Sequence, residues 1–188
     1  WVQHMLYHTS PNGVVGLVLS NGSLSTTSGG EDVIRKNIIK ADLLEAIIAL
    51  PEKLFSNTGI PACIWILNKN KTQQDKTLFI NAKEFGYMLS KKQRNFTSED
   101  VQSLVDTFHS WRNGGDYKDV AGECYSANTE EIAKHNYTLT PGRYVGVVEE
   151  VDDGVTFADK MNTLTAILSE QFEESARLEE RIKKNLTG

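Results

Sequence analysis

Apolar runs of strand length and one helical pattern fill the first 82 residues. The runs end at turn-forming residues, and they are GVVGLVLSNG (Gly13–Gly22), LLEAIIALP (Leu43–Pro51), ACIWILNK (Ala62–Lys69) and KTLFINA (Lys76–Ala82). After the first run, EDVIRKNIIKAD repeats its apolar side chains at helical spacing, with Glu31 and Asp32 at the favourable helix N-terminus. The order of strand, crossover helix and further strands predicts the last half of a doubly wound α/β sheet.

The connections between these runs predict how the strands pair. The first run does not alternate apolar and polar residues, so we expect both of its faces to be buried, as in a parallel sheet covered by helices. Only the ten residues Glu52 to Pro61 separate the second and third runs, which is too short for a crossover helix. We therefore predict an antiparallel pair at the end of the sheet. This arrangement resembles the sheet of S-adenosylmethionine-dependent methyltransferases.

Helical patterns dominate the rest of the chain. We predict a helix that starts at Thr97 or Ser98, a short helix over Thr129–Lys134, and a final helix of about 30 residues. The final helix has an apolar stripe that either folds back on the domain or binds a partner; its members are Met161, Leu164, Leu168, Phe172, Leu178 and Ile182. The patterns divide the chain into an α/β part (1–85), a helical region (86–148) and a last region with the long helix (149–188).

Charge is distributed unevenly along the chain. The net charge is −5, yet Lys53 to Arg94 contains eight basic residues against Asp75 and Glu84. Such a segment is either a solvated surface or a phosphate-facing edge. If it faces DNA, the candidates for backbone contacts are Lys69, Lys71, Lys91, Lys92 and Arg94.

Other classes of protein find little support in the sequence. No apolar run approaches the roughly 20 residues of a membrane span, which favours a cytoplasmic protein without a membrane partner. Cys63 and Cys124 are far apart and suit reduced thiols. His4 and His8 lack a third ligand nearby, so we expect no metal site.

The motif LPEKLFSNTGIPACIWILNKNK, with the apolar runs around it and EEIAKHNYTLTPGRYV further on, carries a family resemblance. The chain resembles the C-terminal part of the modification subunit of type I restriction-modification systems, a family of DNA adenine-N6 methyltransferases. The opening WVQHMLYHTSPNG agrees with a piece of a longer protein, because it looks like the end of a helix. The resemblance implies that the cofactor loop and the Asn-Pro-Pro-aromatic catalytic tetrad lie upstream of Trp1, so no catalytic residue is expected in this chain.

The resemblance gives the turn after the second strand a role. Related adenine methyltransferases use an aromatic residue from this loop against the extruded base, which implies that Phe55 stacks on a flipped adenine. Asn57 and Thr58 would shape the pocket or touch DNA, and Asn21 would reach its rim. Two simpler readings stay open: Phe55 plugs the end of the hairpin, and Asn21 forms an Asn-Gly turn.

The partners implied by the resemblance are DNA, a specificity subunit, a second modification subunit and the restriction subunit. The implied cofactor is S-adenosylmethionine, bound mostly by residues outside this chain, so we expect these 188 residues to be inactive alone. The alternatives are a non-catalytic assembly module that binds the specificity subunit through the final helix, and an unrelated nucleotide-binding enzyme, which lacks the support of a glycine-rich loop.

Overall fold

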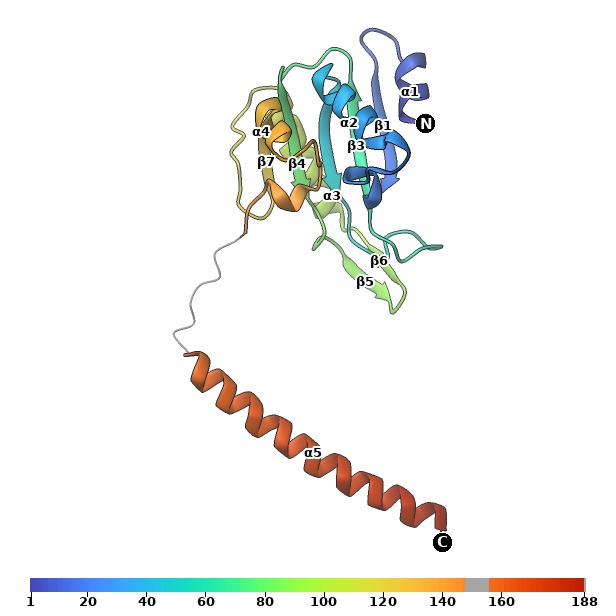
Figure 1. Ribbon diagram of the computed structural model, residues 1–188, viewed down its shortest axis with the longest axis vertical. Helices are drawn as coiled ribbons and strands as arrows, with labels where there is room; N and C mark the ends of the chain where they lie inside the picture. Colours follow the sequence, from blue (N-terminus) through green and yellow to red (C-terminus); the bar gives the residue numbers. More distant parts are fainter. Residues whose placement is uncertain (148–155, 188) are drawn as a thin grey trace. The chain divides into compact units, whose positions relative to one another are not determined.

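A computed structural model describes residues 1–147 and 156–187 of the chain. The contacts divide the chain into two units, Trp1–Val148 and Glu149–Gly188 (Figure 1). The first is an α/β unit and the second contains one long helix, α5 (Phe157–Thr187). Residues 149–155, where the assembly segment was expected to begin, lie outside the described residues.

The α/β unit is built on a mixed five-stranded sheet with the order β1-β3-β2-β4-β7. The strands are β1 (Val14–Ser20), β2 (Leu44–Ala49), β3 (Ala62–Asn68), β4 (Lys76–Asn81) and β7 (Cys124–Asn128). Strand β3 lies between β1 and β2 and is antiparallel to both, whereas β2 and β4 are parallel. The antiparallel pairing predicted for the second and third runs is therefore confirmed, as is the α/β class.

Strand β1 differs from its prediction. It lies at the end of the described sheet, pairs only with β3, and alternates between exposed and half-buried residues. Val15, Leu17 and Leu19 pack against the core, while Val14 and Val18 are about half exposed. The expectation of two buried faces in a parallel pairing was wrong, because within the described residues helices cover only one face of this strand.

Helices cover both faces of the sheet, which makes three layers (Figure 1). Apolar residues of α1 (Val2–His8), α2 (Glu31–Lys40) and α4 (Thr129–Lys134) join Ile47, Trp65 and Phe79 in one core cluster. On the other face, α3 (Ser98–Arg112) packs Trp111 and Phe108 against Ile48 and Ile80. The strand residues alternate between the two clusters, as the two-residue period of a strand requires.

The helix ends follow the chemistry of the sequence. Thr97 forms a capping box with Asp100, and the Thr97 backbone N–H bond lowers the pKa of the Asp100 carboxyl, partly opposed by desolvation. Helix α2 follows Gly29 and Gly30, whose φ angles of 62° and 78° are ones that glycine adopts without strain. The predicted helices at residues 97–112 and 129–134, and the long last helix, are confirmed.

Several elements had no clear signal in the sequence. Strand β7 adds to the main sheet beside β4, so residues 86–147 pack within the first unit. A separate two-stranded sheet pairs β5 (Tyr87–Ser90) with β6 (Gln93–Asn95). Three short 3-10 helices complete the unit: η1 (Asn21–Leu24), η2 (Ser28–Gly30) and η3 (Pro141–Arg143).

Candidate functional site

Three strands of the sheet point the same way and bring their ends together. Because β3 is antiparallel to both β1 and β2, and β2 is parallel to β4, strands β1, β2 and β4 share one direction. Their C-terminal ends define what we call the carboxyl edge, and the opposite side is the amino edge. Open α/β sheets bind ligands at the carboxyl ends of their strands. The segments that follow Ser20, Ala49 and Asn81 meet at this edge.

Phe55 lies on a tight turn in the segment after β2. The Thr58 backbone N–H donates to the Phe55 carbonyl at 3.3 Å, and the Thr58 hydroxyl accepts from the Ile60 N–H at 3.1 Å. The neighbouring Leu54 packs into the α3-side core, whereas Phe55 remains 38% exposed. Asn57, inside the turn, and Thr58 are exposed beside it. The turn therefore presents an aromatic side chain and two polar side chains at the carboxyl edge.

The turn is tied to the segment that follows β4. Lys53, with a φ of 61°, accepts a hydrogen bond from the Arg94 backbone N–H at 2.8 Å. Arg94 in turn donates through Nη1 to the Phe85 carbonyl at 2.9 Å. The guanidinium is thus partly engaged inside the protein, while Lys91 and Lys92 nearby are exposed. The Phe55 turn and the β5–β6 hairpin therefore lie side by side, as Figure 1 shows for their ribbons.

Asn21 lies where β1 ends, as the first residue of η1. The loop that follows is held by the buried Arg35, whose guanidinium donates to the Ser23 carbonyl at 3.2 Å and to the Thr26 carbonyl at 3.0 Å. Burial lowers the pKa of Arg35, and the nearby acidic residues of α2 partly oppose that effect. The fold therefore fixes the backbone around Asn21, and the sequence pattern gave no sign of the role of Arg35.

Three unsatisfied polar side-chain atoms belong to segments that form or flank the carboxyl edge. Among the described residues, three buried side-chain atoms lack a hydrogen-bond partner: Asn21 Oδ1, Asn81 Oδ1 and Arg94 Nε. Asn21 follows β1, Asn81 ends β4, and Arg94 is bonded to the Phe55 segment. Native proteins leave few buried polar atoms unpaired, so a water molecule or a ligand has to satisfy these three atoms.

Two of the predicted DNA-contacting lysines lie elsewhere. Lys71 is buried, with 2% of its side chain exposed, and its ammonium pairs with Asp42 and donates to the Lys76 carbonyl at 2.7 Å. The prediction that Lys71 contacts DNA was therefore wrong, because a buried, paired ammonium is not available to a phosphate. Lys69 is exposed and donates to the Thr9 carbonyl, but it follows β3 and so lies at the amino edge. Its part in DNA binding stays a prediction.

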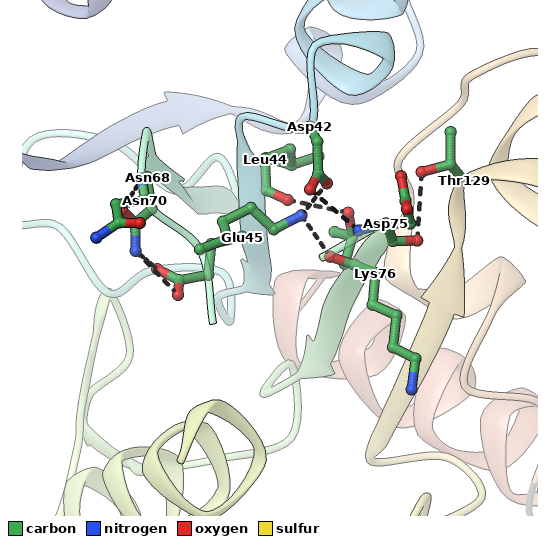
Figure 2. A network of polar contacts seen from close by, with 10 residues as sticks. Asp42, Leu44, Glu45, Asn68, Asn70, Asp75, Lys76 and Thr129 are labelled. Atoms are coloured by element: carbon green, nitrogen blue, oxygen red, sulfur yellow. Dashed lines mark hydrogen bonds and ion pairs between the residues drawn. The ribbon is translucent and has the colours of Figure 1, made fainter. Parts of the chain in front are cut away.

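A polar network explains why Lys71 is at that edge. Figure 2 shows Asp42 accepting from the Asp75 backbone N–H, at 3.0 Å, and Asp75 accepting from Thr129 through its carbonyl. The same view shows the Asn68 amide donating to the Glu45 carboxylate at 3.1 and 3.2 Å. These contacts join the starts of β2 and β4 to the ends of β3 and β7. The basic residues of the sequence are thus divided between the two edges: Lys91 and Lys92 lie near the carboxyl edge, and Lys71 belongs to a polar network at the amino edge.

A cavity opens next to the end of β1 on the α2 side of the sheet. Its volume is about 490 Å³, and its walls include Val2, Ser20, Gly22, Ile34 and Trp65. The size suits a small molecule. Its wall includes one acidic and one basic side chain, Glu31 and Arg35, and the Arg35 guanidinium already donates to backbone carbonyls.

Several other expectations concern chemistry away from this edge. Cys63 and Cys124 are free and buried. Desolvation raises the pKa of the Cys63 thiol. In the described parts of the chain, no three His, Cys, Asp or Glu side chains gather to hold a metal ion. No helix within residues 1–147 and 156–187 combines the length and apolar character needed to cross a membrane.

The comparison with known families agrees with this geometry. Residues 1–153 match the model of the N-6 DNA methylase family. The fold is a mixed, doubly wound α/β sheet with a candidate site at its carboxyl edge. The chain belongs to the N-6 DNA methylase family.

Individual relatives narrow the resemblance. The HindI type I restriction enzyme methylase subunit of Haemophilus influenzae is 54% identical over 188 residues, covering 100% of this chain and 42% of the relative. The MjaIX methylase subunit of Methanocaldococcus jannaschii is 40% identical, covering 99% of this chain and 34% of the relative. The chain therefore spans less than half the length of these relatives.

Solved structures show the same fold. The methyltransferase subunit of a type I restriction-modification system from Streptococcus thermophilus matches with a TM-score of 0.70 and 30% identity, over 78% of this chain and 29% of that one. The M protein of the type I restriction enzyme EcoKI matches with a TM-score of 0.62 over 90% of this chain and 41% of that one. Its identity is 16%, so this second match supports the fold alone.

Proposed function

We propose that the full-length protein to which these residues belong is the modification subunit of a type I restriction-modification system, and that it methylates adenine N6 in DNA. The observation that carries this proposal is the N-6 DNA methylase match over residues 1–153. The 54% identical relative with the name of a type I methylase subunit supports it further. We expect the protein to act in the cytoplasm.

In this proposal the Phe55 turn forms one wall of the base pocket. An enzyme that modifies a base inside a duplex extrudes it, which costs a few kcal/mol of stacking and pairing. A half-exposed aromatic ring on a fixed turn offers the flipped adenine a new stacking surface. Asn57 and Thr58 lie next to the ring and would line the pocket, and Asn21 would lie at its rim across the carboxyl edge.

The described residues hold and orient the base and leave the bond-making chemistry to the rest of the protein. S-adenosylmethionine would supply the methyl group, bound by the part of the protein that these residues do not span. Fixing the adenine against a rigid wall keeps its amino group in place, and such positioning is a large part of catalysis for a direct transfer. DNA phosphates would bind Lys91 and Lys92, with Arg94 beside them.

Purified full-length protein, reconstituted with its specificity subunit, tests the proposal. With S-adenosylmethionine and unmodified bacterial genomic DNA, we expect N6-methyladenine in the digested product by mass spectrometry. The isolated 188-residue chain should form none, because it spans under half the length of its methylase relatives. The absence of N6-methyladenine with the intact complex would contradict the proposal.

A second role, in assembly, is favoured by helix α5. Six apolar side chains recur at helical spacing and are 43 to 67% exposed; they are Met161, Leu164, Leu168, Phe172, Leu178 and Ile182. A stripe of this length is typical of helices that pack on a partner helix. We propose that it binds the specificity subunit, in a complex that also contains a second modification subunit and the restriction subunit.

Charged substitutions on this stripe should break the assembly. We expect the double change Leu164→Asp and Leu168→Asp to abolish co-purification with the specificity subunit, because two carboxylates would be buried without partners. The matched control, Ala166→Asp with Ser169→Asp, adds the same charge on the other side of the helix and should still co-purify. Co-purification of the leucine variant at the wild-type level would argue that α5 has another role.

A further inference from the structure

The β5–β6 hairpin exposes an unusual run of apolar side chains. Tyr87, Met88 and Leu89 are consecutive and are 48, 43 and 57% exposed. All four residues of β5 are exposed. Isolated apolar residues are common on protein surfaces, but three together on a two-stranded ribbon indicate a surface that contacts something else.

The charge of the hairpin is entirely positive. Residues 86–95 contain Lys91, Lys92 and Arg94 and no Asp or Glu, in a chain whose net charge is −5. Ser90 and Gln93 are paired, so Lys91 and Lys92 form the two-residue turn at the tip. The Lys92 backbone N–H donates to the Ser90 hydroxyl at 3.3 Å, which helps to fix that turn. This combination of charge and apolar surface favours a polyanionic partner.

The base of the hairpin is firmly held. Gly86 has a φ of +80°, and a Cβ at this position would lie 2.5 Å from the Asn95 carbonyl oxygen, so only glycine fits without a shift. Phe85 and Phe96, which flank the hairpin, pack into the α3-side core. The ribbon therefore leaves the domain in a defined direction, with its exposed residues beyond the anchored end.

The hairpin lies next to the Phe55 turn through the Arg94 to Lys53 backbone bond of 2.8 Å. We propose that it is a DNA-binding ribbon that enters a groove of the duplex beside the extruded adenine. Lys91 and Lys92 contact phosphates, and Tyr87 and Leu89 contact sugars and base edges. A two-stranded ribbon, with strands about 4.8 Å apart, fits the roughly 12 Å wide major groove. This inference rests on the proposed function, since it places the ribbon beside the same base.

The salt dependence of DNA binding tests this inference in the full-length protein with its specificity subunit. Each lost phosphate contact lowers the slope of log K against log salt by about 0.9. We therefore expect Lys91→Ala with Lys92→Ala to reduce the slope by about 2 on a duplex that contains the recognition site. The matched control, Lys40→Ala with Lys76→Ala, removes the same charge from exposed residues at the amino edge and should leave the slope unchanged.

A second variant isolates the apolar contact. We expect Leu89→Ser to weaken DNA binding about fivefold at every salt concentration, with the wild-type slope, because the change removes apolar area that the proposed DNA contact would bury and removes no charge. Unchanged slopes in the lysine variant would overturn the inference. So would loss of the specificity subunit from the Leu89→Ser complex in size-exclusion chromatography with unchanged DNA affinity, since the ribbon would then contact protein.

The inference and the proposed function can fail separately. Binding slopes are measured without S-adenosylmethionine, so they do not depend on methyl transfer. A wild-type complex that binds the duplex but forms no N6-methyladenine would contradict the proposed function. The salt slopes of the lysine variant would still decide whether the hairpin contacts DNA. Thermal unfolding of each variant, expected within a few degrees of wild type, excludes a folding defect at these exposed positions.

Discussion

Replacing Phe55 by alanine in the full-length protein is expected to lower the rate of adenine methylation about 10- to 100-fold. Stacking of a base on an aromatic side chain contributes about 1–3 kcal/mol per base, and the alanine variant has to hold the extruded adenine without it. Cofactor affinity should stay near normal, because Phe55 lies on the turn after β2 and the cofactor site is expected in the part outside this chain.

The measurement uses a duplex with 2-aminopurine at the target adenine, whose fluorescence increases when the base leaves the stack. We expect a smaller increase for Phe55→Ala and a near-normal one for Phe55→Trp, which keeps an aromatic face. Ile60→Ala is the matched control, since it truncates an exposed apolar residue, 65% exposed, on the same loop.

The competing view, in which Phe55 plugs the hairpin end, makes the opposite prediction. The alanine variant would then lose stability and keep its methylation rate. Because Phe55 is 38% exposed while its neighbour Leu54 occupies the core, we expect the free energy of unfolding to change little. A wild-type rate together with a lower unfolding free energy would assign Phe55 to packing.

The second large effect concerns the buried carboxylate Glu45. This residue is 1% exposed, its Oε1 lies 3.3 Å from Arg112 Nε, and it accepts from the Asn68 amide. We expect Arg112→Met to lower the free energy of unfolding by about 3–5 kcal/mol, because the change leaves a buried charge without its ionic partner. Denaturant unfolding of the 188-residue chain, followed by tryptophan fluorescence, measures this loss; the buried Trp111 is next to the mutated residue.

A double variant separates the charge from the packing. Arg112→Met with Glu45→Gln removes both charges and keeps an oxygen that accepts from Asn68, so most of the lost stability should return. The guanidinium also lies 5.8 Å from the Phe108 ring centroid, a contact that methionine partly replaces. Equal unfolding free energies for wild type and Arg112→Met would show that solvent compensates the Glu45 charge.

The sequence predicted the strands whose residues are continuously apolar, and it missed those that are not. The segments ACIWILN and LLEAIIA are apolar almost throughout because both faces of β3 and β2 are covered, and this continuous pattern predicted buried strands. Strand β7, with the sequence CYSAN, has only Cys124 and Ala127 fully buried, so its pattern resembles a loop and its identity depends on pairing with β4. The alternating burial of β1 was hidden because three of its four exposed positions, Val14, Gly16 and Val18, are not polar.

The candidate site was predictable where it depended on local sequence, as for the Phe55 turn. The positions of the basic residues were harder to predict, because the direction of each strand decides at which edge of the sheet its flanking residues lie. Lys69 and Lys91 belong to one basic segment of the sequence, yet β3 delivers the first to the amino edge and the hairpin after β4 holds the second near Phe55. Burial of Lys71 against Asp42 depends on a contact across 29 positions, which a local pattern does not contain.

The free side of β1 affects how these 188 residues behave in a test tube. Within residues 1–147 and 156–187, the seven residues VVGLVLS pair with a strand on one side only. Their other side offers unpaired backbone donors and acceptors, with no proline or charged residue in the strand to block a second chain. Two molecules can therefore join strand to strand through this side. Oligomers should form as the concentration of the isolated chain rises, so a solubility problem at the bench would reflect an open sheet and not a poorly packed core.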